Sequence, residues 1–336
     1  MHLANPIEGA NLRAPISIEM NTQRDSRFNP VKMTAVVCTR NRADLIGQAV
    51  DSVLTNRHPD FELIVIDQSS DDSTKKALSD AIANSPQLKY VHTTRVGLSA
   101  AYNAGIKMSS GEVLAFTDDD CIAPPDWLTS IEQAFADSPK ADFLYGQVLL
   151  PDSLIGADGV VPTLAIPHQE MIGKPSRFRV FGMGANFAAR RTLFDTVGFF
   201  DEVLGGGGPL RSSQDTDLQY RVYQAGLQTL LSPNVKIDHY GLRNADQWPA
   251  TLLAYGVGDG AFYLKHARCG DLIAIRLFTR RVFREALAYP VRLVRGHRSR
   301  NSYLRGLVAG ARGSFKFSVN RTSRVYVFPP ANTPSA

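Results

Sequence analysis

Residues 112–121 read E-V-L-A-F-T-D-D-D-C, an apolar run that ends in three consecutive acids. A short, nearly continuous apolar run is typical of a strand that is buried on both faces of a parallel sheet. Ligands of such sheets bind beside the carboxyl ends of the strands. The stretch therefore predicts a buried strand that delivers Asp118, Asp119 and Asp120 to a binding site.

Similar strands come before this one, and helices separate them. Apolar runs predict strands at 34–38, 61–67 and 88–92. Apolar residues at helical spacing predict helices over 43–54, from Ser70 or Asp71 to about 83, over 98–108 and over 125–136. Strands that alternate with helices of this length are the signature of βαβ units. We therefore expect an α/β fold with a Rossmann-like, mainly parallel sheet flanked by helices.

Polar residues follow each of the predicted strands. Thr39 and Arg40 follow the first strand, Asp67 and Gln68 the second, and Arg95 the third. The carboxyl ends of parallel strands meet at one edge of the sheet, so these residues and the three acids should form one site. Arginines at these positions are either solvated or placed to bind a diphosphate or a sugar.

The second half of the chain has a less regular pattern. It predicts a strand over 142–150, an irregular loop over 151–176, a strand and turn over 178–191, a flexible glycine loop over 199–209, a helix over 214–223, a strand that ends at His239, and helical structure over 249–316 with an interruption near Pro290.

The composition is that of an ordinary globular protein. The chain has 336 residues, of which 44% are hydrophobic and 21% charged, which excludes a disordered or coiled-coil protein. We see no apolar run long enough to span a membrane and no signal-peptide pattern at the N-terminus. The three cysteines, Cys38, Cys121 and Cys269, form neither a disulfide framework nor a metal cluster. We expect a cytoplasmic protein.

The C-terminal fifth of the chain is strongly basic. The stretch 265–324 carries a net charge of +13, so the rest of this +5 chain carries −8. Such a module suggests phosphate, nucleic acid or anionic lipid as a partner. A helical wheel of 275–293 has one apolar face, whereas Leu277, Leu287 and Val291 lie among arginines on the other half. This helix is either packed on the body with a solvated basic face or bound at an anionic membrane surface.

Two interpretations exist for the Asp118–Asp120 triplet. Adjacent carboxylates at the end of a buried strand repel one another, and Mg²⁺ or Mn²⁺ relieves this repulsion while sharing oxygen ligands with a substrate phosphate. The alternative is a cap for the helix that follows, which needs only one Asp. The three acids therefore favour a metal and phosphate site.

Asp215 and His239 are the other candidates for chemistry. A carboxylate fixed at a helix start can act as a general base toward a hydroxyl, although the same residue can also cap the helix. A histidine after a strand is more often a core or surface residue than a ligand. The chain contains no G-x-G-x-x-G, G-K-[ST] or paired-cysteine motif, so dinucleotide oxidoreductases and P-loop enzymes lose their main support.

Several motifs, in this order, resemble those of a family 2 glycosyltransferase of the GT-A fold. The first half contributes V-V-C-T-R-N-R (36–42), F-E-L-I-V-I-D-Q-S-S-D-D-S-T (61–74), G-L-S-A-A-Y-N-A-G-I (97–106) and F-T-D-D-D-C (116–121). The second half contributes G-A-N-F-A-A-R-R (184–191), V-G-F-F-D-E-V-L-G-G-G (197–207), Q-D-T-D-L-Q-Y-R (214–221) and H-Y-G (239–241). The resemblance covers residues 34 to 241.

The resemblance implies an inverting transfer of a sugar from a nucleoside diphosphate sugar to a hydroxyl, with Mn²⁺ or Mg²⁺ as cofactor. It assigns Asp215 as the catalytic base and Asn186 to the floor between acceptor and donor. The metal would be held by Asp120, Asp118 and His239. The nucleotide sugar would be bound by Thr39, Arg40, Asp67, Gln68, Arg95, Asn103, Asp118 and Asp119. The glycines at 205–208 would let a loop close over the site.

The sequence departs from the family's pattern at three positions. Gln68 stands where a second acid is frequent, Gln214 where a Glu usually precedes the base, and Tyr102 where a basic residue is frequent. Gln68 leaves the nucleotide open, and we expect a UDP- or dTDP-linked donor. The acceptor would be a saccharide or a lipid-linked molecule at the inner face of the cytoplasmic membrane, with no nucleic acid as partner.

The resemblance, the aperiodic N-terminus and the basic C-terminal stretch together predict the domain organisation, and two other functions remain open. We expect a flexible leader over 1–32, a catalytic domain over 33–248, a basic helical extension over 249–320 and a tail over 321–336. Within the catalytic domain, 33–150 is the nucleotide-sugar half and 151–248 the acceptor half. A nucleotidyltransferase would carry a glycine- and lysine-rich loop where this chain has C-T-R-N-R. A non-catalytic lipid- or nucleic-acid-binding adaptor would leave the acids without a role.

Overall fold

The computed structural model describes residues 30–244, 246–294 and 301–329. The strands of its central sheet are β1 Met33–Thr39, β2 Phe61–Asp67, β3 Leu88–His92, β4 Val113–Asp118, β5 Cys121–Ile122, β6 Ala141–Leu149, β7 Glu170–Ile172, β8 Asn186–Arg190 and β9 Gln228–His239. They are ordered β3-β2-β1-β4-β8-β6-β9-β5, with β7 paired to β9. The expected α/β class is confirmed.

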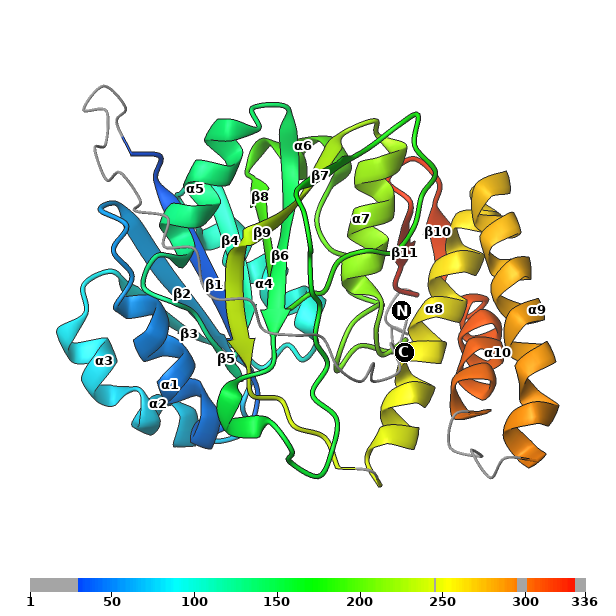
Figure 1. The fold of residues 1–336 in the computed structure, drawn as a ribbon, viewed down its shortest axis with the longest axis horizontal. Coiled ribbons are helices and arrows are strands. Elements are labelled where there is room, and N and C mark those ends of the chain that lie inside the picture. The colour runs from blue at the N-terminus through cyan, green and yellow to red at the C-terminus, as the bar shows by residue number, and fades with distance from the viewer. Residues whose placement is uncertain (1–29, 245, 295–300, 330–336) are drawn as a thin grey trace, which may run out of the picture.

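Helices cover both faces of this sheet. They are α1 Ala43–Leu54, α2 Ser73–Ala77, α3 Ser79–Asn84, α4 Leu98–Met108, α5 Trp127–Asp137, α6 Thr192–Val197 and α7 Gln214–Gln224. The C-terminal part adds α8 Trp248–Arg268, α9 Leu272–Val294, α10 Ser302–Ser314 and a hairpin of β10 Ser318–Asn320 and β11 Val325–Val327. In Figure 1, α8, α9 and α10 stand together at the end of the molecule opposite α1, α2 and α3.

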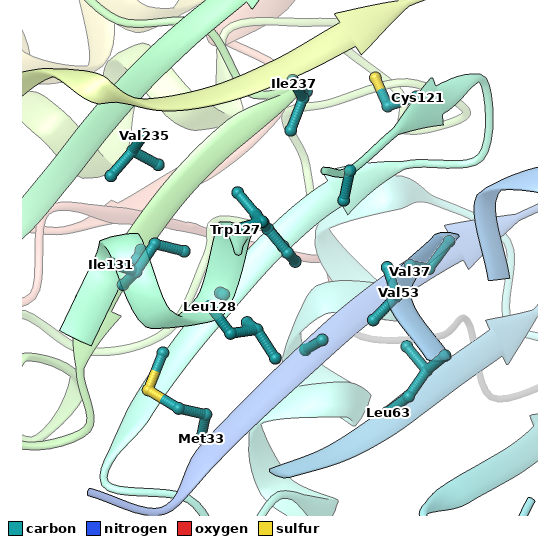
Figure 2. Packing of buried hydrophobic residues seen from close by; sticks show 14 of the residues in the cluster. Met33, Val37, Val53, Leu63, Cys121, Trp127, Leu128, Ile131, Val235 and Ile237 are labelled. Carbon is teal, nitrogen blue, oxygen red and sulfur yellow. The ribbon is translucent and has the colours of Figure 1, made fainter. Parts of the chain in front are cut away.

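Burial on both faces explains why the first strands are continuously apolar. In β1, Met33, Ala35 and Val37 pack with residues of α1 and α5. Val36 and Cys38 pack on the other face with residues of α4, α6 and α7. Figure 2 shows Trp127, Leu128 and Ile131 of α5 in the first of these two cores. Successive side chains of a strand point to opposite faces, so a strand between two helical layers needs no polar alternation.

The sheet is parallel only in part. β1 pairs in parallel with β2 and β4, β2 with β3, and β6 with β9. β8 runs antiparallel to β4 and β6, and β5 and β7 run antiparallel to β9. The prediction of a mainly parallel sheet therefore holds for the first half of the chain, whereas the second half makes the sheet mixed.

Three local predictions need correction. The helix expected to begin at Ser70 or Asp71 begins at Ser73 and is divided into α2 and α3. The loop expected over 151–176 contains β7 and a 3₁₀ turn at Asp152–Leu154. Pro290 lies inside α9 and does not end it, and the helical region is instead broken between α8 and α9, where Gly270 adopts a left-handed backbone.

The C-terminal helices pack closely on one another. A side chain at Gly256 or Gly260 of α8 would overlap the backbone of α10, and one at Gly306 or Gly310 of α10 would overlap the backbone of α8. The glycines therefore let the two helix backbones touch. Within the described residues, none of the helices is long and apolar enough to cross a bilayer. Residues 1–29 of the expected leader, residues 295–300 of the expected basic extension and residues 330–336 of the expected tail lie outside the described residues.

Candidate active site

The carboxyl ends of β1, β2 and β4 meet at one edge of the sheet. Thr39 lies opposite Asp67 in the pairing of β1 with β2, and Cys38 lies opposite Asp118 in the pairing of β1 with β4. The hydroxyl of Thr39 donates a hydrogen bond of 2.6 Å to Oδ2 of Asp119. The predicted convergence of polar strand ends is therefore present, and the acids belong to it.

Arg42, just before α1, forms ion pairs with two of the three acids. Its Nη1 lies 2.5 Å from Oδ1 of Asp119, and its Nη2 lies 2.7 Å from Oδ2 of Asp120. Arg40 is exposed directly after β1. Of the arginines at the strand ends, Arg42 is thus the one that neutralises the triplet.

The triplet is electrostatically crowded. Burial raises the pKa of Asp118 to about 7 and that of Asp119 to about 6, and the charge of Asp120 adds to both rises. Burial acts on Asp120 in the same direction, but His239 and Arg42 outweigh it and hold the pKa of Asp120 below its usual range. Crowding of this kind disfavours three free carboxylates and favours a bound cation.

His239 lies beside the triplet although its strand, β9, is not a neighbour of β4 in the sheet. It ends β9, where it lies opposite Cys121 of β5. Its Nδ1 lies 2.8 Å from the carbonyl oxygen of Pro162, which can only accept, so Nδ1 carries the proton. Its Nε2 lies 3.4 Å from Oδ1 of Asp120. The predicted neighbourhood of His239 and Asp120 is therefore present.

These residues fit a divalent cation. One ligand atom each of Asp120, Cys121 and His239 lie within 4.8 Å of one another. A carboxylate oxygen and an imidazole nitrogen suit Mn²⁺, whereas burial raises the pKa of the Cys121 thiol and keeps it protonated. Asp120 and His239 are therefore the suitable ligands of this group, with Asp118 and Asp119 beside them.

Asp67 and Gln68, which were expected to bind the nucleotide sugar, form hydrogen bonds with other groups of the protein. Asp67 accepts hydrogen bonds from the backbone N–H of Ser69, at 2.8 Å, and from the hydroxyl of Tyr90, at 2.6 Å. The side-chain amide of Gln68 donates to the carbonyl oxygens of Arg95 and Gly97 and accepts from the N–H of Gly97. Gln68 thus fixes the turn before α4, which the sequence did not indicate.

Arg95, which is exposed, and the buried Asn103 also bind groups of the protein. The guanidinium of Arg95 pairs with the carboxylate of Glu202. The side-chain amide of Asn103 donates to Glu202 and to the carbonyl oxygen of Phe200, both at 3.0 Å, and accepts from the N–H of Phe200. Both residues therefore hold the segment before the glycine loop.

The glycine loop is tied to the start of α4. The N–H of Leu98 donates to the carbonyl oxygen of Gly206 at 2.8 Å, and the hydroxyl of Ser99 donates to that of Leu204 at 2.7 Å. Gly205 and Gly207 adopt positive φ angles of 100° and 75°. The loop expected to be flexible is thus anchored in this structure, and its glycines permit the turn.

Asn186 begins β8 and lies opposite Thr117 of β4, the residue before the triplet. It is fully buried, and its Oδ1 accepts from the indole N–H of Trp127 at 3.0 Å. Its Nδ2 donates to the carbonyl oxygens of Gln147 and Val235. Its polar atoms therefore join α5, β6, β8 and β9, and a place for Asn186 at the floor between acceptor and donor stays a prediction.

Asp215 stands in the first turn of α7, as predicted. Its Oδ1 accepts from the N–H of Thr216 at 2.8 Å. Burial raises the pKa of Asp215, with a further contribution from the charge of Asp259, although backbone hydrogen bonds from Thr216 and Gly184 oppose the rise. A carboxylate with a raised pKa is a better proton acceptor from a hydroxyl than an ordinary one.

Two tyrosines connect Asp215 with the triplet. Burial and the charges of both Asp118 and Asp215 raise the pKa of Tyr102, whose hydroxyl donates to Oδ1 of Asp118 at 3.4 Å. Burial and the same two carboxylates act in the same direction on Tyr255 of α8, against Arg243. The predicted base and Asp118 of the triplet therefore both lie near Tyr102 and Tyr255.

A buried ionic cluster around Asp217, two residues after Asp215, was not predicted from the sequence. Asp217 is fully buried and lies 2.6 Å from Nζ of Lys265, 2.8 Å from Nε2 of His266 and 3.0 Å from Nε of Arg221. Lys265 also lies 2.6 Å from Asp201. Only the i, i+4 spacing of Asp217 and Arg221 signalled part of it, since Lys265 and His266 belong to the basic extension.

Comparison with known proteins agrees with this arrangement. Residues 34–198 match the model of the family described as Glycosyl transferase family 2. The glucosyl-dolichyl phosphate glucuronosyltransferase of Haloferax volcanii is 23% identical over 217 residues, which are 62% of this chain and 69% of that protein. An uncharacterized glycosyltransferase of Nostoc sp. is 29% identical over 109 residues, 32% of this chain and only 34% of that relative.

Two solved structures share the fold at 18% identity. The mannosyltransferase PcManGT from Pyrobaculum calidifontis, in complex with GDP-Man and Mn²⁺, has a TM-score of 0.57 and covers 85% of this chain and 88% of its own. S. aureus TarS 1–349, in complex with UDP-GlcNAc, has a TM-score of 0.51, and the match covers 68% of this chain and 66% of that one. These likenesses confirm the GT-A type of fold. With the ordered motifs, the assembled acids and the match of residues 34–198 to the family model, they support a family 2 glycosyltransferase.

Proposed function

We propose that this chain transfers a sugar from a nucleoside diphosphate sugar to a hydroxyl acceptor, with inversion at the anomeric carbon. The observation that carries the proposal is that Asp118 of the triplet and Asp215 both lie close enough to Tyr102 and Tyr255 to raise the pKa values of these tyrosines, and that the hydroxyl of Tyr102 contacts Asp118. The triplet side suits a diphosphate with its cation, and the Asp215 side suits the proton of an attacking hydroxyl. The two groups required for sugar transfer thus come from opposite halves of the chain.

In the proposed mechanism Asp215 is the general base. The acceptor oxygen forms a bond to the anomeric carbon while the bond from that carbon to the diphosphate breaks. The acceptor proton passes to the carboxylate of Asp215, and the electron pair of the broken bond leaves with the nucleoside diphosphate. Because attack comes from the face opposite the leaving group, the configuration inverts in one step.

Asp120 and His239, with Asp118 beside them, are the residues that would hold Mn²⁺ or Mg²⁺. The bound cation would supply neutralisation of the diphosphate leaving group. A thermal-shift experiment with nucleoside diphosphate tests this metal assignment. The stabilisation of the protein with Mn²⁺ should vanish with chelator and in Asp120→Ala. Ligand at 100 times its dissociation constant adds about 2.7 kcal/mol to stability. Equal stabilisation with and without metal would refute the assignment.

A UDP- or dTDP-linked sugar remains the proposed donor. The UDP-GlcNAc complex of S. aureus TarS supports a pyrimidine, whereas the GDP-Man complex of PcManGT shows that this fold also accepts a purine. The thermal-shift experiment should therefore compare UDP-, dTDP- and GDP-sugars. Exclusive stabilisation by a GDP-sugar would contradict the pyrimidine proposal.

The proposed place of work is the inner face of the cytoplasmic membrane, with a lipid-linked or polysaccharide-precursor acceptor. Ala274 and Glu285 are the buried residues of α9. Its outer side exposes Leu272 by 77%, Phe283 by 67%, Leu287 by 61% and Val294 by 89%, together with the exposed Arg276, Arg280 and Arg284. Apolar side chains interspersed with arginines suit the headgroup region of an anionic bilayer.

The activity is tested with purified protein, a hydroxyl acceptor and either a nucleotide sugar or a nucleoside triphosphate. A glycosyltransferase releases nucleoside diphosphate from the sugar donor in an acceptor-dependent manner. Pyrophosphate release from the triphosphate would instead indicate a nucleotidyltransferase. Product stereochemistry, read by the anomeric coupling in NMR, tests inversion separately.

A further inference from the structure

The segment that leads into α7 has an unusual backbone. Arg211 and Ser213 adopt positive φ angles of 66° and 68°, in a region that side chains other than glycine rarely occupy. Ser213 is the residue before α7 and lies two positions before Asp215. Whatever holds Ser213 in this conformation therefore also sets the direction in which α7 and Asp215 leave the loop.

Ser213 does not cap its own helix with its side chain. A serine at this position usually accepts a hydrogen bond from an N–H of the first turn, but no such bond is made here. Its hydroxyl instead donates to Oδ1 of Asp259, in α8, at 2.8 Å. The neighbouring Ser212 donates to the carbonyl oxygen of Ala254 at 2.9 Å, and its backbone lies where a side chain at Gly258 would be.

Asp259 is itself fixed by the other two C-terminal helices. Its Oδ2 accepts a hydrogen bond from the hydroxyl of Tyr303 in α10 and lies 3.6 Å from Nη2 of Arg281 in α9. The guanidinium of Arg281 also lies over the ring of Tyr303, 5.1 Å from its centroid. One carboxylate therefore joins α8, α9 and α10 to the residue from which α7 begins.

We propose that Asp259 is a positioning residue for the reaction, holding Ser213 in its left-handed conformation and thereby aiming Asp215 at the acceptor. This inference rests on the proposed role of Asp215 as the base. It gives the C-terminal extension a direct part in the active site, which the division into a catalytic domain and an appended basic module did not anticipate.

The charge of Asp259 gives a second, separable effect. Burial and this charge both act to raise the pKa of Asp215. Titratable groups near Asp215 also include Tyr102 of α4, Tyr145 of β6 and Tyr255 of α8, whose pKa values burial and the Asp215 charge raise. These tyrosines are neutral at neutral pH, so Asp259 is the charged neighbour whose removal should lower the pKa of Asp215.

Two substitutions of Asp259 separate its hydrogen bond with Ser213 from its negative charge. Asp259→Ala removes the partner of Ser213, and we expect kcat to fall by about tenfold or more, as for a base displaced by a fraction of an ångström, with KM for the donor nearly unchanged. Asp259→Asn keeps an acceptor oxygen for Ser213 but removes the charge. We expect this variant to keep most of kcat while the acidic limb of its pH profile moves to lower pH.

Rescue distinguishes positioning from mere packing. Glycine adopts a positive φ angle without support, so adding Ser213→Gly to Asp259→Ala should restore most of kcat. Glu285→Gln is the matched control, because Glu285 is a buried, arginine-paired carboxylate of the same extension, bound to Arg292 at 2.8 Å. Its kcat should equal that of the wild type, and thermal melting should show that each variant is folded.

Wild-type kcat in a folded Asp259→Ala, or a loss that Ser213→Gly does not restore, would overturn the inference. If Asp259→Ala does not fold, Ser213→Ala and Ser213→Gly decide it: the alanine should lower kcat and the glycine should not, and equal rates would overturn it. Asp215→Asn is measured in parallel. Normal turnover there would refute the base itself, whereas an inactive Asp215→Asn beside normal Asp259 variants refutes only the positioning role.

Discussion

Nζ of Lys265, in α8, lies 2.6 Å from Oδ1 of Asp217, two residues beyond Asp215 in α7. Both side chains are fully buried, and Asp217 also contacts His266 and Arg221. A buried ion pair with several hydrogen bonds fixes the relative position of two elements more than it stabilises them. The helix that carries the proposed base is therefore locked to the C-terminal extension.

Lys265→Met should destabilise the fold strongly. The substitution leaves the carboxylates of Asp217 and Asp201 without their shared cation, and removing one partner of a buried pair costs about 3–5 kcal/mol. The free energy of unfolding from denaturant titration measures this. Lys89→Met is the control, because Lys89 is half exposed in its pair with Glu62 and should cost about 1 kcal/mol or less. Similar losses in both variants would contradict the prediction.

His266 should make stability fall in mild acid. Burial is the main reason that its pKa is lowered to about 4, against the pull of Asp217. Between pH 6.5 and 4 the unfolded chain binds a proton at His266 that the folded chain does not, so stability is present above pH 6.5 and is lost as pH falls. The loss is on the order of 3 kcal/mol. His266→Gln should flatten this part of the stability curve, and an unchanged slope would show that another group is responsible.

Two glycines in helices should respond oppositely to alanine. A methyl group at Gly260 of α8 would overlap the carbonyl oxygen of Leu307 in α10, so Gly260→Ala should destabilise the protein by about 1–3 kcal/mol. Gly47 of α1 has open space at the same position, and Gly47→Ala should stabilise by up to about 1 kcal/mol. Thermal or denaturant unfolding of both variants tests this. A neutral Gly260→Ala would mean that α8 and α10 do not pack through their backbones.

The outer side of α9 should bind anionic vesicles in a salt-dependent manner. Each arginine near such a surface contributes about 1 kcal/mol, so replacing Arg276, Arg280 and Arg284 together with Gln should weaken co-sedimentation by about 100-fold or more. The control replaces three exposed arginines elsewhere, Arg57, Arg177 and Arg321. Binding that ignores lipid charge and salt, or no binding, would indicate a helix with a solvated basic face.

The first half of the chain was predictable because its strands are buried on both faces. A continuous apolar run such as β4 predicts a buried strand from the local sequence alone. Because the carboxyl ends of parallel strands lie at one edge of the sheet, Thr39 and the three acids could be placed together. The antiparallel return of β8 beside β4 carries no such local signal. The role of Gln68 was missed because its amide binds backbone atoms 27 and 29 residues away.

The C-terminal partners of α7 could not be found from the sequence for a similar reason. Lys265 and His266 lie in a stretch whose net charge suggests a solvated or lipid-facing surface, yet both are fully buried. Only tertiary packing brings them to Asp217, 48 and 49 residues earlier in the chain. Asp259 is equally inconspicuous, since one acid in a basic module has no periodic pattern.

The most direct test of the proposed activity is the initial rate of sugar transfer by Asp215→Asn, with donor binding measured on the same protein. Asn keeps the shape of Asp but cannot accept the proton, so we predict a rate lower by about 10²–10⁴-fold and an unchanged donor affinity. Asp195→Asn, at an exposed position of α6, is the control and should keep the wild-type rate. A near-normal rate in Asp215→Asn would contradict the role of Asp215 as the general base.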